Sequence, residues 1–147
     1  MQSRINPYQV APDAMKGLVD FENHVHALGL EKSLLGLVKL RASQINGCAF
    51  GLHMHGKEAR AGGETEERIY LLDAWRDSPL YSERERAALA WTEAVTRVSE
   101  THVPDVVYDE VKEHFGGEEL VKLTLLVATI NSWNRIAISF RAVHPNS

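Results

Sequence analysis

The chain of 147 residues contains one cysteine, Cys48, and this scarcity excludes an intrachain disulfide. A lone cysteine suits the reducing cytoplasm, where disulfides are rare, so we expect a cytoplasmic protein. Basic blocks are also absent: 16 Lys and Arg residues against 20 Asp and Glu residues give a net charge of -4. We therefore expect no nucleic-acid partner, because binding of that kind relies on clustered positive charge.

Long apolar runs are missing as well. The most apolar segment, residues 120–130, is too short to span a bilayer and is interrupted by Lys122. The first eight residues contain no apolar signal region, so we expect no membrane association. The whole chain has 44% hydrophobic and 24% charged residues, a composition typical of a globular protein. Its length fits a single domain over residues 1–147.

Apolar residues recur at helical spacing along nearly the whole chain, which predicts an all-α fold of about seven helices. Turn and capping residues mark the ends of the expected helices. The first starts at Pro12, the second ends at Asn46-Gly47, and the third runs from near Cys48 to Gly62-Gly63. The fourth is capped by Thr65 and ends before Pro79, the fifth starts with a capping box at Ser82 and Glu85, the sixth runs from Pro104 to Gly116-Gly117, and the last runs from near Glu118 past Phe140. The last helix is apolar over most of its surface, which predicts a buried central position.

Cys48 and His55 are the candidate catalytic residues. Cys48 is expected at the start of a helix, where unpaired backbone N–H groups and the helix dipole favour a thiolate. His55 lies seven residues further on, shares the same helix face and could accept the thiol proton. Two turns span roughly 10 Å of helix axis, so water or a rearranged first turn would have to link the two groups.

Two stretches together resemble the AhpD-like (alkyl hydroperoxidase D-like) proteins of the carboxymuconolactone decarboxylase family. The first runs from Leu40 to Phe50 as LRASQINGCAF, continued by Met54-His55 and by residues 57–60 as KEAR. The second is residues 131–137, NSWNRIA, which is similar to the family's final helix. The resemblance covers about residues 10–143. It implies an all-helical AhpD-like domain that assembles as homodimers or larger rings.

The resemblance also implies a Cys-x-x-Cys-x-x-x-His redox centre with a glutamate twelve residues before the first cysteine. Cys48 matches the first cysteine and His55 the histidine, whereas Gly51 stands at the second cysteine and Gly36 at the glutamate. With one cysteine, a dithiol–disulfide cycle within one subunit is impossible. Asp73 and Glu93 are candidates to replace the missing glutamate in space.

Three functions remain open. In the first, the protein is a peroxiredoxin-like alkyl hydroperoxide reductase or thiol oxidoreductase, in which Cys48 forms a sulfenic acid that an external thiol or a neighbouring subunit reduces. In the second, His55 moves protons in a cofactor-free decarboxylase or lactone-processing enzyme. In the third, the fold is an inactive binding or structural protein, with no room beside Cys48. For a diacid substrate the candidate partners are Arg41, Arg60, Arg135 and Arg141.

No metal or organic cofactor is expected. The pairs His24/His26 and His53/His55 are two residues apart, which places their side chains about 200° apart on a helix, so neither pair chelates from one face. We expect solvated helix histidines there. Trp133 falls on an apolar stripe beside Asn131 and Asn134, whose buried amides need partners and either satisfy backbone or line a pocket.

Overall fold

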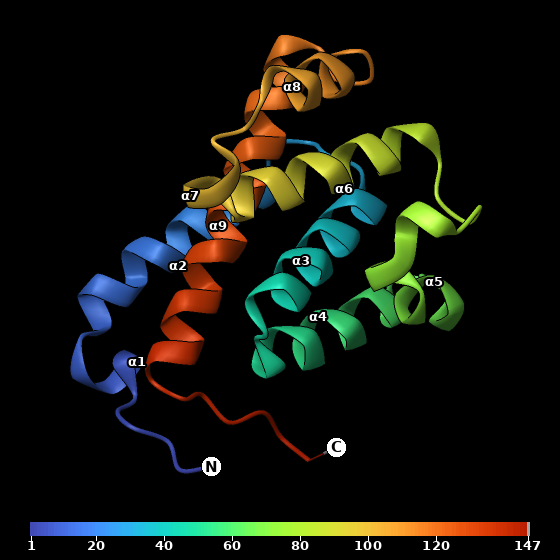
Figure 1. Cartoon of the computed structure of the whole chain (residues 1–147). Coiled ribbons are helices and arrows are strands. Elements are labelled where there is room, and N and C mark those ends of the chain that lie inside the picture. Colours follow the sequence, from blue (N-terminus) through green and yellow to red (C-terminus); the bar gives the residue numbers. More distant parts are fainter. Residues whose placement is uncertain (147) are drawn as a thin grey trace.

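The computed structural model describes residues 1–146, and these residues form helices and no β-strand (Figure 1). In chain order the helices are α1 (Pro7–Val10), α2 (Pro12–His26), α3 (Lys32–Asn46), α4 (Ala49–Ala61), α5 (Glu66–Tyr70), the 3-10 helix η1 (Leu72–Asp77), α6 (Glu83–Thr96), α7 (Val98–Thr101), α8 (Asp105–Lys112) and α9 (Gly117–Ser139). The predicted all-α class is confirmed. Within the same residues, no helix is both long and apolar enough to cross a membrane.

All seven expected helical stretches are present, and three short segments bring the total above seven in the described part of the chain. One turn, α1, precedes the first expected helix, and α7 follows α6. The fourth expected helix is split into α5 and η1, because the backbone leaves helical geometry at Ala74 (φ -112°, ψ 31°). Such short turns carry too little periodicity to be read from sequence.

Local signals in the sequence set most helix ends. Gly47 takes a left-handed conformation (φ 65°) after α3, as a glycine at this position allows. Ser82 and Glu85 form the predicted reciprocal capping box at the start of α6. The Thr65 hydroxyl caps α5 by accepting from the Arg68 N–H at 3.2 Å. These ends fix α3 and α4 as consecutive helices joined at Gly47 and Cys48.

Helix α3 is as central as the last helix. It packs against α4, α6 and α9, and its residues Leu37 to Ser43 are all buried. One face, with Leu34 and Val38, joins a core with α6, α8 and α9, and another, with Leu37 and Leu40, joins a second core with η1 and α6. The predicted burial of α9 holds for its middle, whereas Val121 and Ile138 are exposed.

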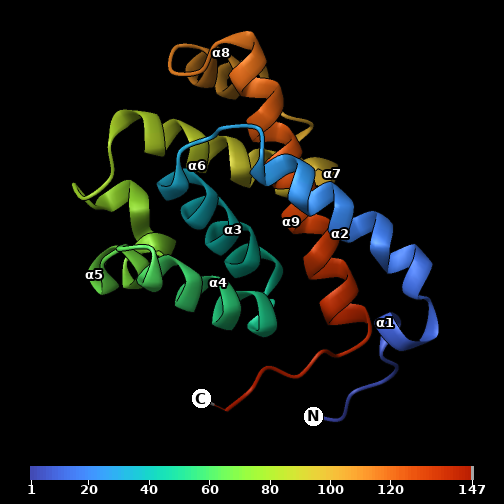
Figure 2. The same cartoon turned by 180° about the vertical axis from the view of Figure 1, so that it is seen from behind.

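The last helix ends earlier than predicted. It stops at Ser139 and does not run past Phe140, because Arg141 takes a positive φ of 52°. The chain after it turns back beside the N-terminal segment, and the Arg4 N–H donates to the Phe140 carbonyl at 3.0 Å. Both termini therefore lie at the same end of the molecule, below α4 and α9 (Figures 1 and 2).

Candidate active site at Cys48 and His55

Cys48 is the N-cap residue of α4. Its backbone is extended (φ -91°, ψ 97°), and its Sγ accepts a hydrogen bond from the Gly51 N–H at 3.4 Å. The thiol thus occupies the position of a capping oxygen and faces the unpaired N–H groups of the first turn. The predicted placement of Cys48 at the start of a helix is confirmed. The residue is 2% exposed.

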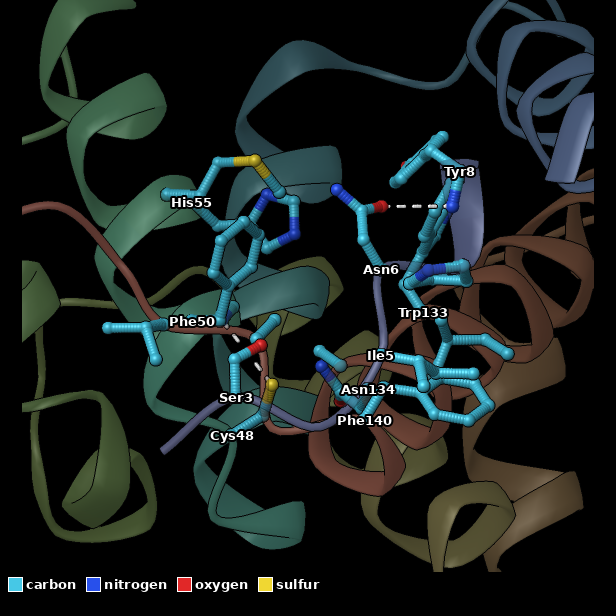
Figure 3. A pocket seen from close by; sticks show the side chains of 17 residues that line it. Ser3, Ile5, Asn6, Tyr8, Cys48, Phe50, His55, Trp133, Asn134 and Phe140 are labelled. Carbon is cyan, nitrogen blue, oxygen red and sulfur yellow. Dashed lines mark hydrogen bonds between the residues drawn. The ribbon is translucent and has the colours of Figure 1, made fainter. Parts of the chain in front are cut away.

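A cavity of about 360 Å³ lies over Cys48 (Figure 3). It is enclosed by α4, by the end of α9 and by the two terminal segments. Most of its lining is apolar: Ile5, Pro7, Tyr8, Phe50, Gly51, Met54, Trp133, Ile136, Ala137, Phe140, Ala142 and Val143. The polar lining consists of Ser3, Asn6, Cys48, His55 and Asn134. Because Cys48 and His55 line the same cavity, one small molecule can reach both.

His55 is buried, with 5% of its surface exposed, so the prediction of solvated helix histidines is wrong for this residue. Its Nδ1 lies 3.0 Å from Oε2 of Glu58, one turn further along α4. Burial lowers the pKa of His55 because it disfavours the imidazolium, and the charge of Lys39 acts in the same direction. The hydrogen bond and charge of Glu58 oppose this lowering. The ring is therefore held mainly in its neutral, proton-accepting form.

His55 also lines a second cavity, of about 540 Å³, which lies further along α4 toward its C-terminal end. This cavity lies between α3 and α4 and is rich in charged and polar groups: His26, Lys32, Ser33, Lys39, His55, Glu58 and Glu64. The two sets of lining residues share His55 alone. The imidazole is thus the side chain at which an apolar and a polar cavity meet.

A buried charged cluster borders the second cavity. Lys39 Nζ, on a side chain that is 4% exposed, donates to Glu22 Oε1 at 2.8 Å and also contacts His26 Nε2. Glu22 Oε2 accepts from the Trp133 indole N–H at 3.1 Å. Burial by itself raises the pKa of Glu22, but the Lys39 hydrogen bond and charge, His26 and the indole N–H outweigh it and lower that pKa.

The space around the two glycines differs. A Cβ added at Gly51 would lie 2.7 Å from Ser43 Oγ, 3.0 Å from Asn134 Nδ2 and 3.3 Å from Cys48 Sγ. Asn134 Nδ2 donates to Ser43 Oγ at 3.1 Å, so a hydrogen-bonded pair crowds the position of the missing cysteine. A Cβ at Gly36 would meet only Ala59 Cβ, at 3.5 Å.

Neither predicted substitute for the missing glutamate reaches the site. Glu93 accepts from Arg41 Nε at 3.0 Å and from the Trp75 indole at 2.8 Å, between α3, η1 and α6. Asp73 is paired with Arg41 at 2.6 Å, its side chain 80% exposed. Neither residue lines a cavity with His55. The prediction is wrong because the sequence does not show how η1 and α6, which carry these two carboxylates, pack relative to α4.

The carboxylate that does contact His55, Glu58, was missed by the sequence analysis although its signal was present. It lies three residues after His55, and side chains at this spacing share a helix face. Glu22 had a signal too, since it falls on the apolar stripe of α2. Lys39 carried none. Of the other site histidines, His53 stacks on His144, with ring centroids 4.7 Å apart.

Comparison with known proteins decides the family. The carboxymuconolactone decarboxylase family matches residues 12–94, more than half of the chain. The chain belongs to this family. It is an AhpD-like member, and the matched residues contain α2, α3, α4 and therefore both Cys48 and His55.

Known relatives extend the match over nearly the whole AhpD-like chain. It is 43% identical to the uncharacterized protein YdfG of Bacillus subtilis over 139 residues, 95% of each chain. A crystal structure from Agrobacterium tumefaciens is 47% identical with a TM-score of 0.97, covering 99% of this chain and 100% of the other. That protein, ATU0492, is of unknown function, with AhpD antioxidant defence suggested for it.

The fold also occurs in an enzyme of another activity. The debrominase Bmp8 superposes with a TM-score of 0.80 at 18% identity, over 92% of this chain and 73% of that one. Identity at this level shows the fold alone. Function therefore has to be argued from the residues of the site.

Proposed function

We propose that this AhpD-like protein is a one-cysteine peroxidase that reduces organic hydroperoxides. The observation that carries the proposal is that the Cys48 thiol and the neutral, buried His55 line one mainly apolar cavity. The Cys48 thiol caps α4 and accepts a hydrogen bond from the Gly51 N–H, and a neutral imidazole can take a thiol proton. The apolar lining suits an alkyl or aryl hydroperoxide better than hydrogen peroxide.

In the proposed reaction, His55 takes the proton of the Cys48 thiol through a water molecule in the cavity that both residues line, and Sγ attacks the terminal oxygen of the hydroperoxide. The S–O bond forms and the O–O bond breaks, so the sulfur is oxidised to the sulfenic acid. The proton passes from His55 to the leaving alkoxide, and the organic product is an alcohol. The sulfenic acid is the reversible first stage of thiol oxidation.

The reductant in this proposal is an external thiol, since Gly51 supplies no second sulfur. One thiol condenses with the sulfenic acid, forming a mixed disulfide and releasing water. A second thiol attacks that disulfide, releases the Cys48 thiolate and leaves as a disulfide with the first. Two thiols are oxidised for each hydroperoxide reduced. The proposal includes assembly into homo-oligomers, in which Cys48 of a neighbouring subunit could supply one of these thiols.

Two features of the cavity disfavour the alternatives. An inactive protein was expected to have no room beside Cys48, whereas the cavity there has a volume of about 360 Å³. A decarboxylase for diacids was expected to use arginines, but within the described residues the cavity lining includes none of the four candidate arginines. Arg41, the most buried of them, is paired with Glu93.

The test is intact mass of the reduced protein after mixing with cumene hydroperoxide and a sulfenic-acid trap. We expect rapid, stoichiometric addition at Cys48, none in Cys48→Ser, and a rate lower by about 100-fold in His55→Gln, because general-base catalysis contributes at least that much. Hydrogen peroxide should react more slowly. Addition no faster than that of a free cysteine peptide would overturn the proposal.

A further inference from the structure

His55 requires a partner that fixes its proton, and the glutamate that the family places twelve residues before Cys48 is replaced by Gly36. The described structure puts a different carboxylate in contact with the ring. Glu58 Oε2 lies 3.0 Å from His55 Nδ1, and both residues are on α4, three positions apart. The orientation of the imidazole is therefore set within one helix.

The chemistry of this contact assigns the two ring nitrogens. An ionised carboxylate can only accept, so Nδ1 of a neutral His55 carries the hydrogen, and Nε2 is left as the proton acceptor. Glu58 lines the polar cavity and is absent from the lining of the apolar one, whereas His55 lines both. The accepting edge of the ring is thereby left for the cavity that contains Cys48.

We infer that Glu58 is the positioning residue of a Cys48–His55–Glu58 triad, holding His55 in the tautomer that accepts the thiol proton and stabilising the imidazolium that forms. This inference rests on the proposed function, because it deepens the role of the same site. The arrangement follows the general logic of a nucleophile, a base and a carboxylate that orients the base. No atom is added to the reaction: the proton still travels from Cys48 to the alkoxide through His55.

Exposure and charge around the pair support this role. The side chain of Glu58 is 59% exposed while that of His55 is 5% exposed, so the carboxylate is solvated while the ring is not. A carboxylate in hydrogen-bond contact with the ring can stabilise a transient positive charge on it. The charge of Lys39 acts against that positive charge, which makes a carboxylate on the ring more necessary.

Other titratable groups also face this part of the molecule. From α2 these are Glu22 and His26, and from α3 Lys39, with Lys32 and Glu64 further along the polar cavity. From α9 the neighbours are Trp133 and Asn134, which do not titrate. Of the charged groups that act on His55, Glu58 opposes its lowered pKa most strongly, through both a hydrogen bond and its charge.

The test is the pH dependence of Cys48 oxidation in wild type and Glu58→Gln. The rate should rise with pH as His55 loses its proton, so the midpoint of that rise reports its pKa. Because Glu58 raises the pKa of His55, Glu58→Gln should move the midpoint to lower pH and lower the plateau rate by about tenfold. The matched control is Glu67→Gln, an exposed acidic residue of α5, which should leave both unchanged.

Nitrogen-15 NMR of the imidazole provides a second readout that needs no activity. Wild-type His55 should show the Nδ1–H tautomer, and Glu58→Ala, which removes the acceptor altogether, should lose it. Glu58→Asp, which keeps the charge on a shorter side chain, should restore the midpoint in part. An unchanged midpoint and plateau in Glu58→Gln, together with an unchanged tautomer in Glu58→Ala, would overturn the inference and leave the peroxidase intact. A tautomer that depends on Glu58 in a protein that fails to react with hydroperoxide would instead overturn the proposed function alone.

Discussion

The two cavities that meet at His55 differ in the residues that line them. The one over Cys48 is closed by apolar side chains from both termini, α4 and α9, whereas the one between α3 and α4 is lined by lysines, histidines and glutamates. An imidazole between them can meet an organic substrate on one side while its charge is set from the other.

Each cavity is also lined by one of the two glycines at which the resemblance to the family implies another residue. Gly36, in the polar cavity, leaves open space, since an added Cβ would make only an ordinary contact with Ala59. Gly51, in the apolar cavity, is crowded by the hydrogen-bonded pair of Ser43 and Asn134. A side chain at Gly36 would therefore have space, whereas one at Gly51 would not.

The buried ion pair of Glu22 and Lys39, beside the cavity between α3 and α4, should matter most for stability. Glu22→Gln leaves the ammonium of Lys39 buried without its carboxylate, so we expect the free energy of unfolding to fall by about 3 kcal/mol. The measurement is urea denaturation at neutral pH. Asp20→Asn is the control: it removes the exposed pair with Lys16 and should cost less than about 0.5 kcal/mol. Equal effects of the two variants would contradict the assignment of a buried ion pair.

The ion pair of Glu22 and Lys39 also predicts that the free energy of unfolding falls at acidic pH. The folded-state pKa of Glu22 lies below its ordinary value of 4.5, so its contribution is complete above that pH and is lost as the pH falls through the lower folded-state value. Wild type should therefore lose stability below about pH 4.5, and Glu22→Gln should lose less over the same range. Parallel urea midpoints of the two proteins across this range would argue against the linkage.

The size of the cavity over Cys48 should control the access of substrate to the thiol. Ala137→Phe fills the cavity with a ring, and we expect the rate with cumene hydroperoxide to fall by about tenfold or more, because pocket size discriminates by such factors. Ala61→Phe places the same ring in the polar cavity and should change the rate less than about twofold. Rates come from the mass titration. A larger loss of rate in Ala61→Phe than in Ala137→Phe would indicate that the substrate binds in the cavity between α3 and α4, and would contradict the proposal.

The two glycines should respond to alanine with opposite signs. Gly36→Ala meets no obstacle and gains helix propensity, so it should stabilise the protein by about 0.5–1 kcal/mol. Gly51→Ala forces Ser43 or Asn134 to move and should destabilise by about 1 kcal/mol. Thermal unfolding measures both. Adding Ser43→Ala to Gly51→Ala removes the closest contact and should recover part of the loss; no recovery would mean that Asn134 sets the cost.

Helix positions and the candidate pair were open to prediction because the forces that set them are local. Apolar spacing, the capping box of Ser82 and the left-handed Gly47 act within a few residues, and Cys48 and His55 share one helix. Glu58 falls within the same local range and could have been found from its spacing to His55. The two failed candidates, Asp73 and Glu93, lie on other elements, where spacing carries no information on distance.

The sequence by itself determined the helices, the thiol at a helix start and the absence of a second cysteine, because composition and backbone hydrogen bonding along the chain decide these. Only the tertiary structure decided which groups surround them. Lys39 meets Glu22 across 17 positions, Asn134 meets Ser43 across 91, and both termini close over Cys48. Such contacts depend on how the helices pack against one another, and packing is settled by the whole core at once.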